Sequence, residues 1–197
     1  MSVLQQPRIT PDEYLQAERK AEFRSEYYGG SMYARSGGSP RHSSIGLNIG
    51  AELRQRLRGS ECKAAGSDLS VCVAKSRFYA YPDVVVYCGK PEFPERRNDV
   101  LLNPKLLIEV LSPSTEAYDR GFKSQQYRAI PSLEEYALIS QHEARVEIQT
   151  RAPDGAWVLH EWTGIGAECR FDSINCCVPL AEIYLGIEFD GTIQITG

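Results

Sequence analysis

The stretch PKLLIEVLSPSTEAYDRGFK, residues 104–123, places an ionisable side chain in the middle of an apolar run. The pattern of residues 105–112 predicts a short buried strand, and Glu109 interrupts it. An unpaired carboxylate in a protein interior is costly and tends to stay protonated. The stretch therefore indicates a structural ion pair, an exposed edge strand, or a cleft in which several carboxylates share a divalent cation.

A second strand with an acid at its start precedes this stretch, in the sequence YPDVVVYC, residues 81–88. Val84 to Val86 show no alternation, which is typical of a central strand that is buried on both faces. Pro82 has no N–H group, so it marks the start of the strand or a bulge and leaves Asp83 near the core but accessible. Acids from two neighbouring strands can converge on one ion, and Mg²⁺ binds carboxylate oxygens together with water and substrate phosphate.

A helix is expected after the Ser-Pro turn, from about Thr115 or Asp119 to Ala129. In such a helix Lys123 lies one turn after Asp119 and on the same side. A lysine beside a metal-bound water can orient the nucleophile or stabilise the charge that develops on a phosphoryl group. The spacing alone is more typical of a surface ion pair between Asp119 and Lys123, worth only about 0.3–0.5 kcal/mol.

The rest of the chain alternates between helix and strand signals. A T-x-x-E capping box at Thr10 predicts a helix that begins at Pro11, and Gly29-Gly30 predicts a hairpin turn within residues 25–34. A long helix is expected from four apolar residues spaced four apart, Ile45, Ile49, Leu53 and Leu57. Further strands are expected at 68–74, 78–88, 134–140, 145–151, 156–162 and 168–171, with a turn at 154–155 and a short helix within 179–186. Helices flanking a mixed sheet make the fold class α/β (α+β), in a single domain over residues 1–197 with its core at about 10–185.

The composition excludes some partners and leaves others open. A formal charge of −4 and a pI of about 5.5 argue against a protein that coats nucleic acid by bulk charge, although metal ions and a local basic patch can still support a nuclease. The arginines near the end of the long helix, at 54, 56 and 58, are more typical of a solvated helix end than of phosphate contacts. No apolar stretch reaches the roughly 18 residues of a membrane span, so no membrane partner is expected.

The cysteines show no zinc-site spacing, and the first residues lack the pattern of a signal peptide. A cytoplasmic, reduced protein is therefore expected. In it the six cysteines would serve mostly as small core side chains rather than as disulfides or metal ligands: Cys62, Cys72, Cys88, Cys169, Cys176 and Cys177.

Several motifs in a fixed order carry a family resemblance: EYYGGSMYA, His42, SDLSV, YPDVVVYC and NPKLLIEVLSPSTEAYDRGFKSQQYRAIPSLEEYALIS. From about Thr10 to Leu185 the chain resembles the Uma-two family of bacterial restriction-endonuclease-like proteins, within the PD-(D/E)XK nuclease superfamily. The resemblance implies a restriction-endonuclease-like fold, with a central mixed sheet flanked by helices. It also implies phosphodiester cleavage that depends on Mg²⁺, with Mn²⁺ as a substitute.

The resemblance also assigns roles to acids. Asp83 matches the acid of the PD element and Glu109 the acid of the (D/E)XK element, so these two are the expected metal ligands. Glu26 matches an early acid of the family and is expected to join the catalytic site. Asp68 and His42 match recurrent family positions near the cleft. For Asp68 a role in a turn or at the start of a strand is at least as typical, and for His42 a capping or core role is the more typical one.

The chain departs from the superfamily pattern two residues after Glu109, where Leu111 replaces the lysine of the motif. In the family the lysine comes from the following helix, which points to Lys123, and Tyr127 one turn further is expected to line the same cleft. The resulting expectation is an endonuclease that acts on DNA and forms a homodimer. The alternatives are a catalytically degenerate nucleic-acid-binding or regulatory protein of the same fold, and an interaction module.

Overall fold

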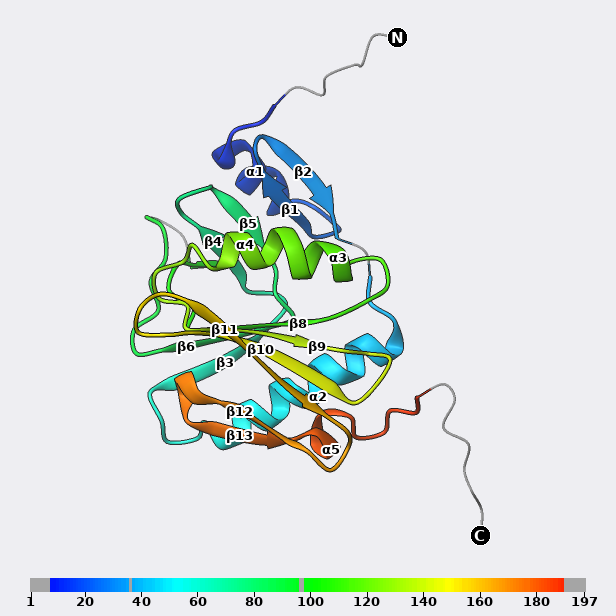
Figure 1. The fold of residues 1–197 in the computed structure, drawn as a ribbon. Helices are drawn as coiled ribbons and strands as arrows, with labels where there is room; N and C mark the ends of the chain where they lie inside the picture. The colour runs from blue at the N-terminus through cyan, green and yellow to red at the C-terminus, as the bar shows by residue number, and fades with distance from the viewer. Residues whose placement is uncertain (1–7, 36, 96–97, 190–197) are drawn as a thin grey trace.

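The computed structural model of the protein describes residues 8–35, 37–95 and 98–189. Its centre is a six-stranded sheet, with helical segments on its two faces (Figure 1). The strands follow one another across this sheet in the order β11 (Trp157–Thr163), β10 (Arg145–Arg151), β9 (Glu135–Ile139), β8 (Leu106–Val110), β6 (Val84–Cys88) and β3 (Cys62–Gly66). Strands β8 and β9 run parallel and the other neighbours antiparallel, which confirms the expected mixed sheet flanked by helices.

The centre of this sheet is buried on both faces, as the apolar runs predict. Val84 and Val86 of β6 face one hydrophobic cluster, whereas Val85 between them faces another. Strand β8 alternates in the same way, with Ile108 in the first cluster and Leu107 in the second. Side chains alternate along a strand, so unbroken apolar runs are needed where both faces are covered.

Helix α2 (Pro40–Arg56) covers one face of the sheet (Figure 1). Its apolar residues spaced four apart form the buried stripe, and Ser39 caps its first turn by accepting a hydrogen bond from the backbone N–H of His42. Gly46 and Gly50 lie above the sheet, where an added Cβ would stand 3.9 Å and 3.7 Å from valine methyl groups of β8 and β6. The long helix expected here is confirmed.

The opposite face carries the helical segment that follows β8 (Figure 1). It consists of α3 (Glu116–Tyr118), a π-helical turn η1 (Asp119–Lys123) and α4 (Ser124–Tyr127), where the sequence predicts one continuous helix. The aromatic rings of Phe122 and Tyr127 pack on Phe78, at centroid distances of 5.4 Å and 5.9 Å. A π-helical turn is often found at functional sites, because it changes the direction of the side chains it contains.

A second, five-stranded sheet lies beyond this helical segment (Figure 1). Its order is β2 (Ser31–Ala34), β1 (Ser25–Tyr28), β5 (Phe78–Ala80), β4 (Ser70–Val73) and β7 (Val100–Leu101). The run expected at 78–88 is divided into β5 and β6, which belong to different sheets and are separated by Tyr81, Pro82 and Asp83. Strands β3 and β7 lack a clear signal in the sequence.

Two expected elements support this second sheet. Helix α1 (Pro11–Glu18) has the reciprocal capping box between Thr10 and Glu13. Gly29 and Gly30 turn the β1–β2 hairpin with φ angles of 59° and 90°, a conformation that glycine adopts without steric cost.

The C-terminal part of the described chain packs against α2, below it in the view of Figure 1. It contains β12 (Glu168–Phe171), the short 3₁₀ turn η2 (Asp172–Ile174), β13 (Cys176–Pro179) and α5 (Leu180–Ile183). Across the described ranges, every helix is too short or too polar to cross a membrane.

The cysteines correct one expectation. Cys62 of β3 and Cys88 of β6 form a disulfide, because the antiparallel register places them directly opposite each other. The expectation that these two are unpaired core side chains is therefore wrong. It holds for Cys72, Cys169 and Cys176, which are buried and free.

Candidate functional site

Lys123 lies at the centre of a buried group of carboxylates. Its Nζ is 3.0 Å from Oε1 of Glu26, 3.0 Å from Oε1 of Glu109 and 3.2 Å from Oδ1 of Asp119. All four side chains are at least nine-tenths buried. Burial by itself would lower the pKa of Lys123, but the charges of Glu109, Glu26 and Asp119 outweigh it and raise this pKa. The lysine is therefore held as an ammonium ion, and it is not the surface partner of Asp119 that its spacing favours.

Glu109 is oriented through one of its two oxygens. The hydroxyl of Tyr127 donates a hydrogen bond of 3.1 Å to Oε1, the same oxygen that Lys123 contacts. For Oε2 the structure gives no hydrogen bond within the described residues, and the side chain lines a large cavity. Burial raises the pKa of Glu109 to about 8, Lys123 opposes this shift, and the charges of Asp119 and Asp83 add to it.

Glu26 reaches the site from the second sheet. It lies in β1, and its Oε2 accepts a 2.9 Å hydrogen bond from the hydroxyl of Tyr118 in α3. Tyr118 in turn stacks on Phe122, with ring centroids 5.4 Å apart. The hairpin and the helical segment are thus joined by the same acid that contacts Lys123.

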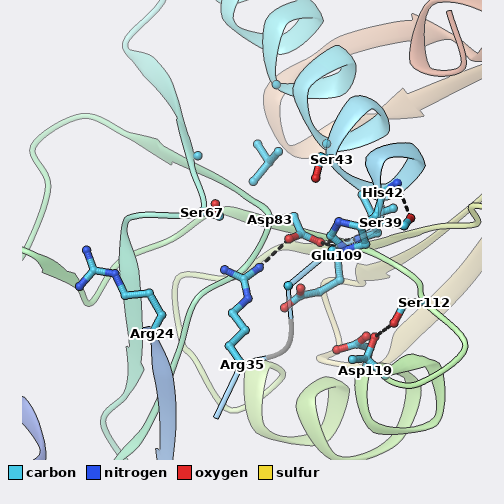
Figure 2. A pocket seen from close by; sticks show the side chains of 18 of the residues that line it. Arg24, Arg35, Ser39, His42, Ser43, Ser67, Asp83, Glu109, Ser112 and Asp119 are labelled. Carbon is cyan, nitrogen blue, oxygen red and sulfur yellow. Dashed lines mark hydrogen bonds and ion pairs between the residues drawn. The ribbon is translucent and has the colours of Figure 1, made fainter. Parts of the chain in front are cut away.

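Asp83 is held by three donors at the start of β6 (Figure 2). Nη2 of Arg35 lies 2.6 Å from its Oδ1, while Nε2 of His42 and the backbone N–H of Val110 lie 3.2 Å and 2.8 Å from its Oδ2. Burial would raise the pKa of Asp83, but His42, Val110 and Arg35 together lower it. The hydrogen bond to Asp83 likewise raises the pKa of His42, against the effect of burial.

The sheet register brings Asp83 and Glu109 together. Val84 pairs with Ile108 in the antiparallel β6–β8 ladder, so the preceding residue Asp83 stands opposite Glu109 (Figure 2). Asp83 lies just beyond the last paired residue, and its Oδ2 accepts a hydrogen bond from the backbone N–H of Val110 at the end of β8. Both acids line one cavity of about 1210 Å³, which also reaches the start of α2.

Most of the site residues expected from the sequence meet in this cavity. Asp83, Glu109, Glu26 and Lys123 line it, and His42 reaches it from α2 through its side chain while its backbone N–H is capped. Tyr127, which was expected to line the cleft, does not: its side chain is fully buried behind the cavity and reaches the site through its hydrogen bond to Glu109.

Asp68 differs from the other expected residues. It is exposed in the turn after β3 and lines the cavity wall, and no contact joins it to the carboxylates among the residues described. Arg35 and Tyr118 were not expected in the site. Their partners, Asp83 and Glu26, are 48 and 92 residues away, so no local pattern could identify them.

The acidic side chains of the site are of the type that binds a divalent cation. Four of them, Glu26, Asp83, Glu109 and Asp119, lie beside two permanent cations, Lys123 and Arg35. Oδ1 of Asp119 is buried without a hydrogen bond, although it lies within ion-pair distance of Lys123. Carboxylate oxygens are the donors that Mg²⁺ prefers. Within the described ranges no three acidic, histidine or cysteine side chains have the arrangement of a metal site, and both oxygens of Asp83 are already engaged, Oδ1 by Arg35 and Oδ2 by His42 and the backbone N–H of Val110.

The chain has relatives that are similar over most of its length. The model of the Uma2 family, described as "Putative restriction endonuclease", matches residues 11–173. Two proteins of Synechocystis sp. are similar to the chain: "Uncharacterized protein slr1290", 33% identical over 183 residues (93% of this chain and 95% of the relative), and "Uncharacterized protein sll1609", 36% identical over 163 residues (83% and 92%). A crystal structure of a "putative nuclease belonging to DUF820" from Anabaena variabilis matches with a TM-score of 0.72 at 18% identity, over 89% of this chain and 97% of that one. At this identity the likeness shows the fold.

Proposed function

Because the chain belongs to the Uma2 family, we propose that it is an endonuclease that hydrolyses phosphodiester bonds in DNA with the help of a divalent cation. The observation that carries this proposal is the buried ammonium of Lys123 between three carboxylates, in the same cavity as Asp83. An ion cluster of this kind is costly to bury, and strongly perturbed pKa values are typical of catalytic sites. The nuclease-like relatives support the reaction class.

Asp83 and Glu109 are the residues that would hold the cation. They offer carboxylate oxygens from adjacent strands, and Oε2 of Glu109 makes no hydrogen bond among the described residues. When bound, Mg²⁺ or Mn²⁺ would supply Lewis-acid polarisation of the phosphate and a more acidic water.

Lys123 is proposed as the cationic donor of the reaction. Its ammonium can donate a hydrogen bond to the attacking water or to a phosphate oxygen, where negative charge grows in the transition state. Glu26 and Asp119 hold Nζ in place, and Tyr127 fixes the carboxylate of Glu109 next to it. These contacts orient the reacting groups before substrate binds, which is how positioning lowers a barrier.

A nucleic-acid-binding protein without catalysis is the second candidate. The observation that favours it is the engagement of both oxygens of Asp83, one by Arg35 and the other by His42 and Val110. In such a protein these contacts would persist and the acids would serve stability alone.

Cleavage of supercoiled plasmid with Mg²⁺ or Mn²⁺ separates the two candidates. We expect nicking by the wild type and a loss of at least about 100-fold in Asp83→Asn and Lys123→Met, since catalytic groups of this type contribute that much. Lys105→Met is the matched control, because Lys105 is half-buried and pairs with Glu134 at 3.2 Å away from the cavity. Equal nicking by all four proteins would identify a contaminant and overturn the proposal.

A further inference from the structure

Two aromatic side chains stand open at the mouth of the cavity. Phe23, before β1, is 75% exposed and Tyr33 of β2 is 51% exposed, and both line the cavity. Within the described part of the chain, neither ring packs on another ring. Tyr33 pairs with Glu26 in the β1–β2 register, so it lies on the same side of the hairpin as the acid that contacts Lys123. The exposed rings of Phe23 and Tyr33 therefore border the same cavity as the candidate site.

Two arginines that form no ion pair with the described residues line the same cavity. Arg24 lies on the hairpin side, 5.5 Å above the ring of Tyr81, and Arg54 lies on the exposed side of α2 (Figure 2 shows Arg24). Neither has an acidic side chain within ion-pair distance among the described residues. By contrast Arg56, two residues further along α2, pairs with Glu52 at 2.9 Å and lies outside the cavity lining. Unpaired arginines at a cavity favour an anionic ligand.

The cavity continues as a groove along α2. The helix presents small residues to it, Gly46, Gly50 and Ala51, and β3 adds Ala64, Ala65 and Gly66 on the facing wall. From Ser39 at the helix start to Arg54 the groove follows the helix for roughly 22 Å. Apart from the exposed Leu47, a polymer chain that extends from the acidic site toward Arg54 therefore meets mainly small side chains of α2 and β3.

We propose that this cavity binds a single strand of DNA, with unpaired bases stacked on Phe23 and Tyr33 and phosphates at Arg24 and Arg54. This inference rests on the proposed function, since it names the form of nucleic acid that the same site takes. The faces of paired bases are covered by their neighbours in a duplex, whereas unpaired bases can stack on aromatic side chains. Exposed rings beside unpaired arginines are the combination that single-strand-binding grooves use.

Binding of fluorescein-labelled DNA, followed by anisotropy in EDTA so that no cleavage occurs, tests the proposal. The probes are one strand of mixed sequence and the duplex that it forms with its complement. We expect the wild type to bind the strand about tenfold or more tightly than the duplex. Phe23→Ala and Tyr33→Ala should each weaken binding of the strand by roughly 5- to 150-fold, with little change for the duplex. Arg54→Gln should weaken both complexes and make binding less dependent on salt.

Matched controls come from neighbouring residues. Met32→Ala changes an exposed residue beside Tyr33 that does not line the cavity, and Arg56→Gln changes the paired arginine of α2. Both should bind the strand as the wild type does. Equal affinity for strand and duplex, or unchanged binding of the strand by Phe23→Ala and Tyr33→Ala, would overturn the inference. A dimer that Phe23→Ala dissociates, without loss of strand binding, would also overturn it and make this face an interface between copies.

Failure of the inference and failure of the proposed function give different results. If the wild type binds the strand through Phe23 and Tyr33 but never cleaves it with Mg²⁺ or Mn²⁺, the proposed function fails and the inference holds. If the protein cleaves DNA with Mg²⁺ or Mn²⁺ but Phe23→Ala and Tyr33→Ala bind the single strand as tightly as the wild type does, the function holds and the inference fails.

Discussion

The ammonium of Lys123 lies 3.0 Å from the carboxylate of Glu109, although the two residues come from different elements and are 14 positions apart. Leu111, which stands where the related motif has its lysine, is buried in the hydrophobic core on the side of the sheet toward which Glu109 points. The π-helical turn η1 instead delivers the lysine from the segment that crosses this face. The positive charge beside Glu109 therefore comes from Lys123 in the helical segment and not from residue 111 of the chain after β8.

Removal of the lysine should destabilise the protein more than removal of an ordinary lysine. Lys123→Met leaves three buried carboxylates without their counter-ion, and breaking a buried ion pair in this way costs about 3–5 kcal/mol. Urea unfolding in EDTA measures this loss. Lys105→Met, at a half-exposed surface pair, should cost less than about 1 kcal/mol. Equal stability of Lys123→Met and wild type would contradict the buried cluster.

Stability of the metal-free protein should depend on pH through Glu109. Burial raises its pKa from an ordinary 4.5 to about 8, so between these values the folded protein binds more protons than the unfolded chain. The stability that this group contributes is fully present below pH 4.5 and is lost as the pH rises through about 8. Urea unfolding at several pH values should show this decline, and Glu109→Gln should flatten it. The same decline in Glu109→Gln would assign it to another group.

Metal affinity should increase when Arg35 loses its charge. The guanidinium holds Oδ1 of Asp83 at 2.6 Å, and a cation that binds this carboxylate must replace it. A charged hydrogen bond contributes about 1.5–3 kcal/mol, so Arg35→Gln should bind Mn²⁺ roughly tenfold or more tightly in calorimetry without DNA. Arg24→Gln, which lines the same cavity without contacting Asp83, is the control. Weaker binding by Arg35→Gln would mean that Arg35 organises the site instead of competing for it.

The disulfide between Cys62 and Cys88 should contribute to stability. It closes a loop across a sequence separation of 26, which in the chain-entropy model corresponds to about 3–4 kcal/mol. Cys62→Ser with Cys88→Ser should unfold at a lower urea concentration than the wild type, by about this amount. Thiol counting under denaturing, non-reducing conditions gives the independent check. Six free thiols in the purified protein would contradict the disulfide.

Much of the site is visible in local patterns of the chain. Asp83 and Glu109 interrupt runs that are otherwise apolar, and an acid in such a run must be paired or bound because isolated burial is costly. The regular spacing of apolar residues likewise defines α2, since a helix can bury only one stripe. The resemblance to a family places Lys123 in the site, whereas its spacing from Asp119 favours a surface pair.

Other features follow from contacts between distant segments. Arg35, Tyr118 and the opposed pair Cys62–Cys88 occupy positions that no local pattern marks. Their partners are chosen by strand order and register, which depend on the packing of the whole chain. The division of residues 78–88 between two sheets also depends on contacts between distant segments. The sequence pattern does not reveal it, because both halves have the apolar composition of a strand.

Side-chain chemistry and periodicity act locally, so the chain alone predicts which segments are buried, where α1 and α2 lie, and which acids stand in costly positions. The contacts of Lys123 with Glu26, Glu109 and Asp119, and the pairing of Arg35 with Asp83, depend instead on how distant segments pack. The reason is physical: the energy of a charge in the interior depends on which partners surround it, and those partners come from three separate parts of the chain.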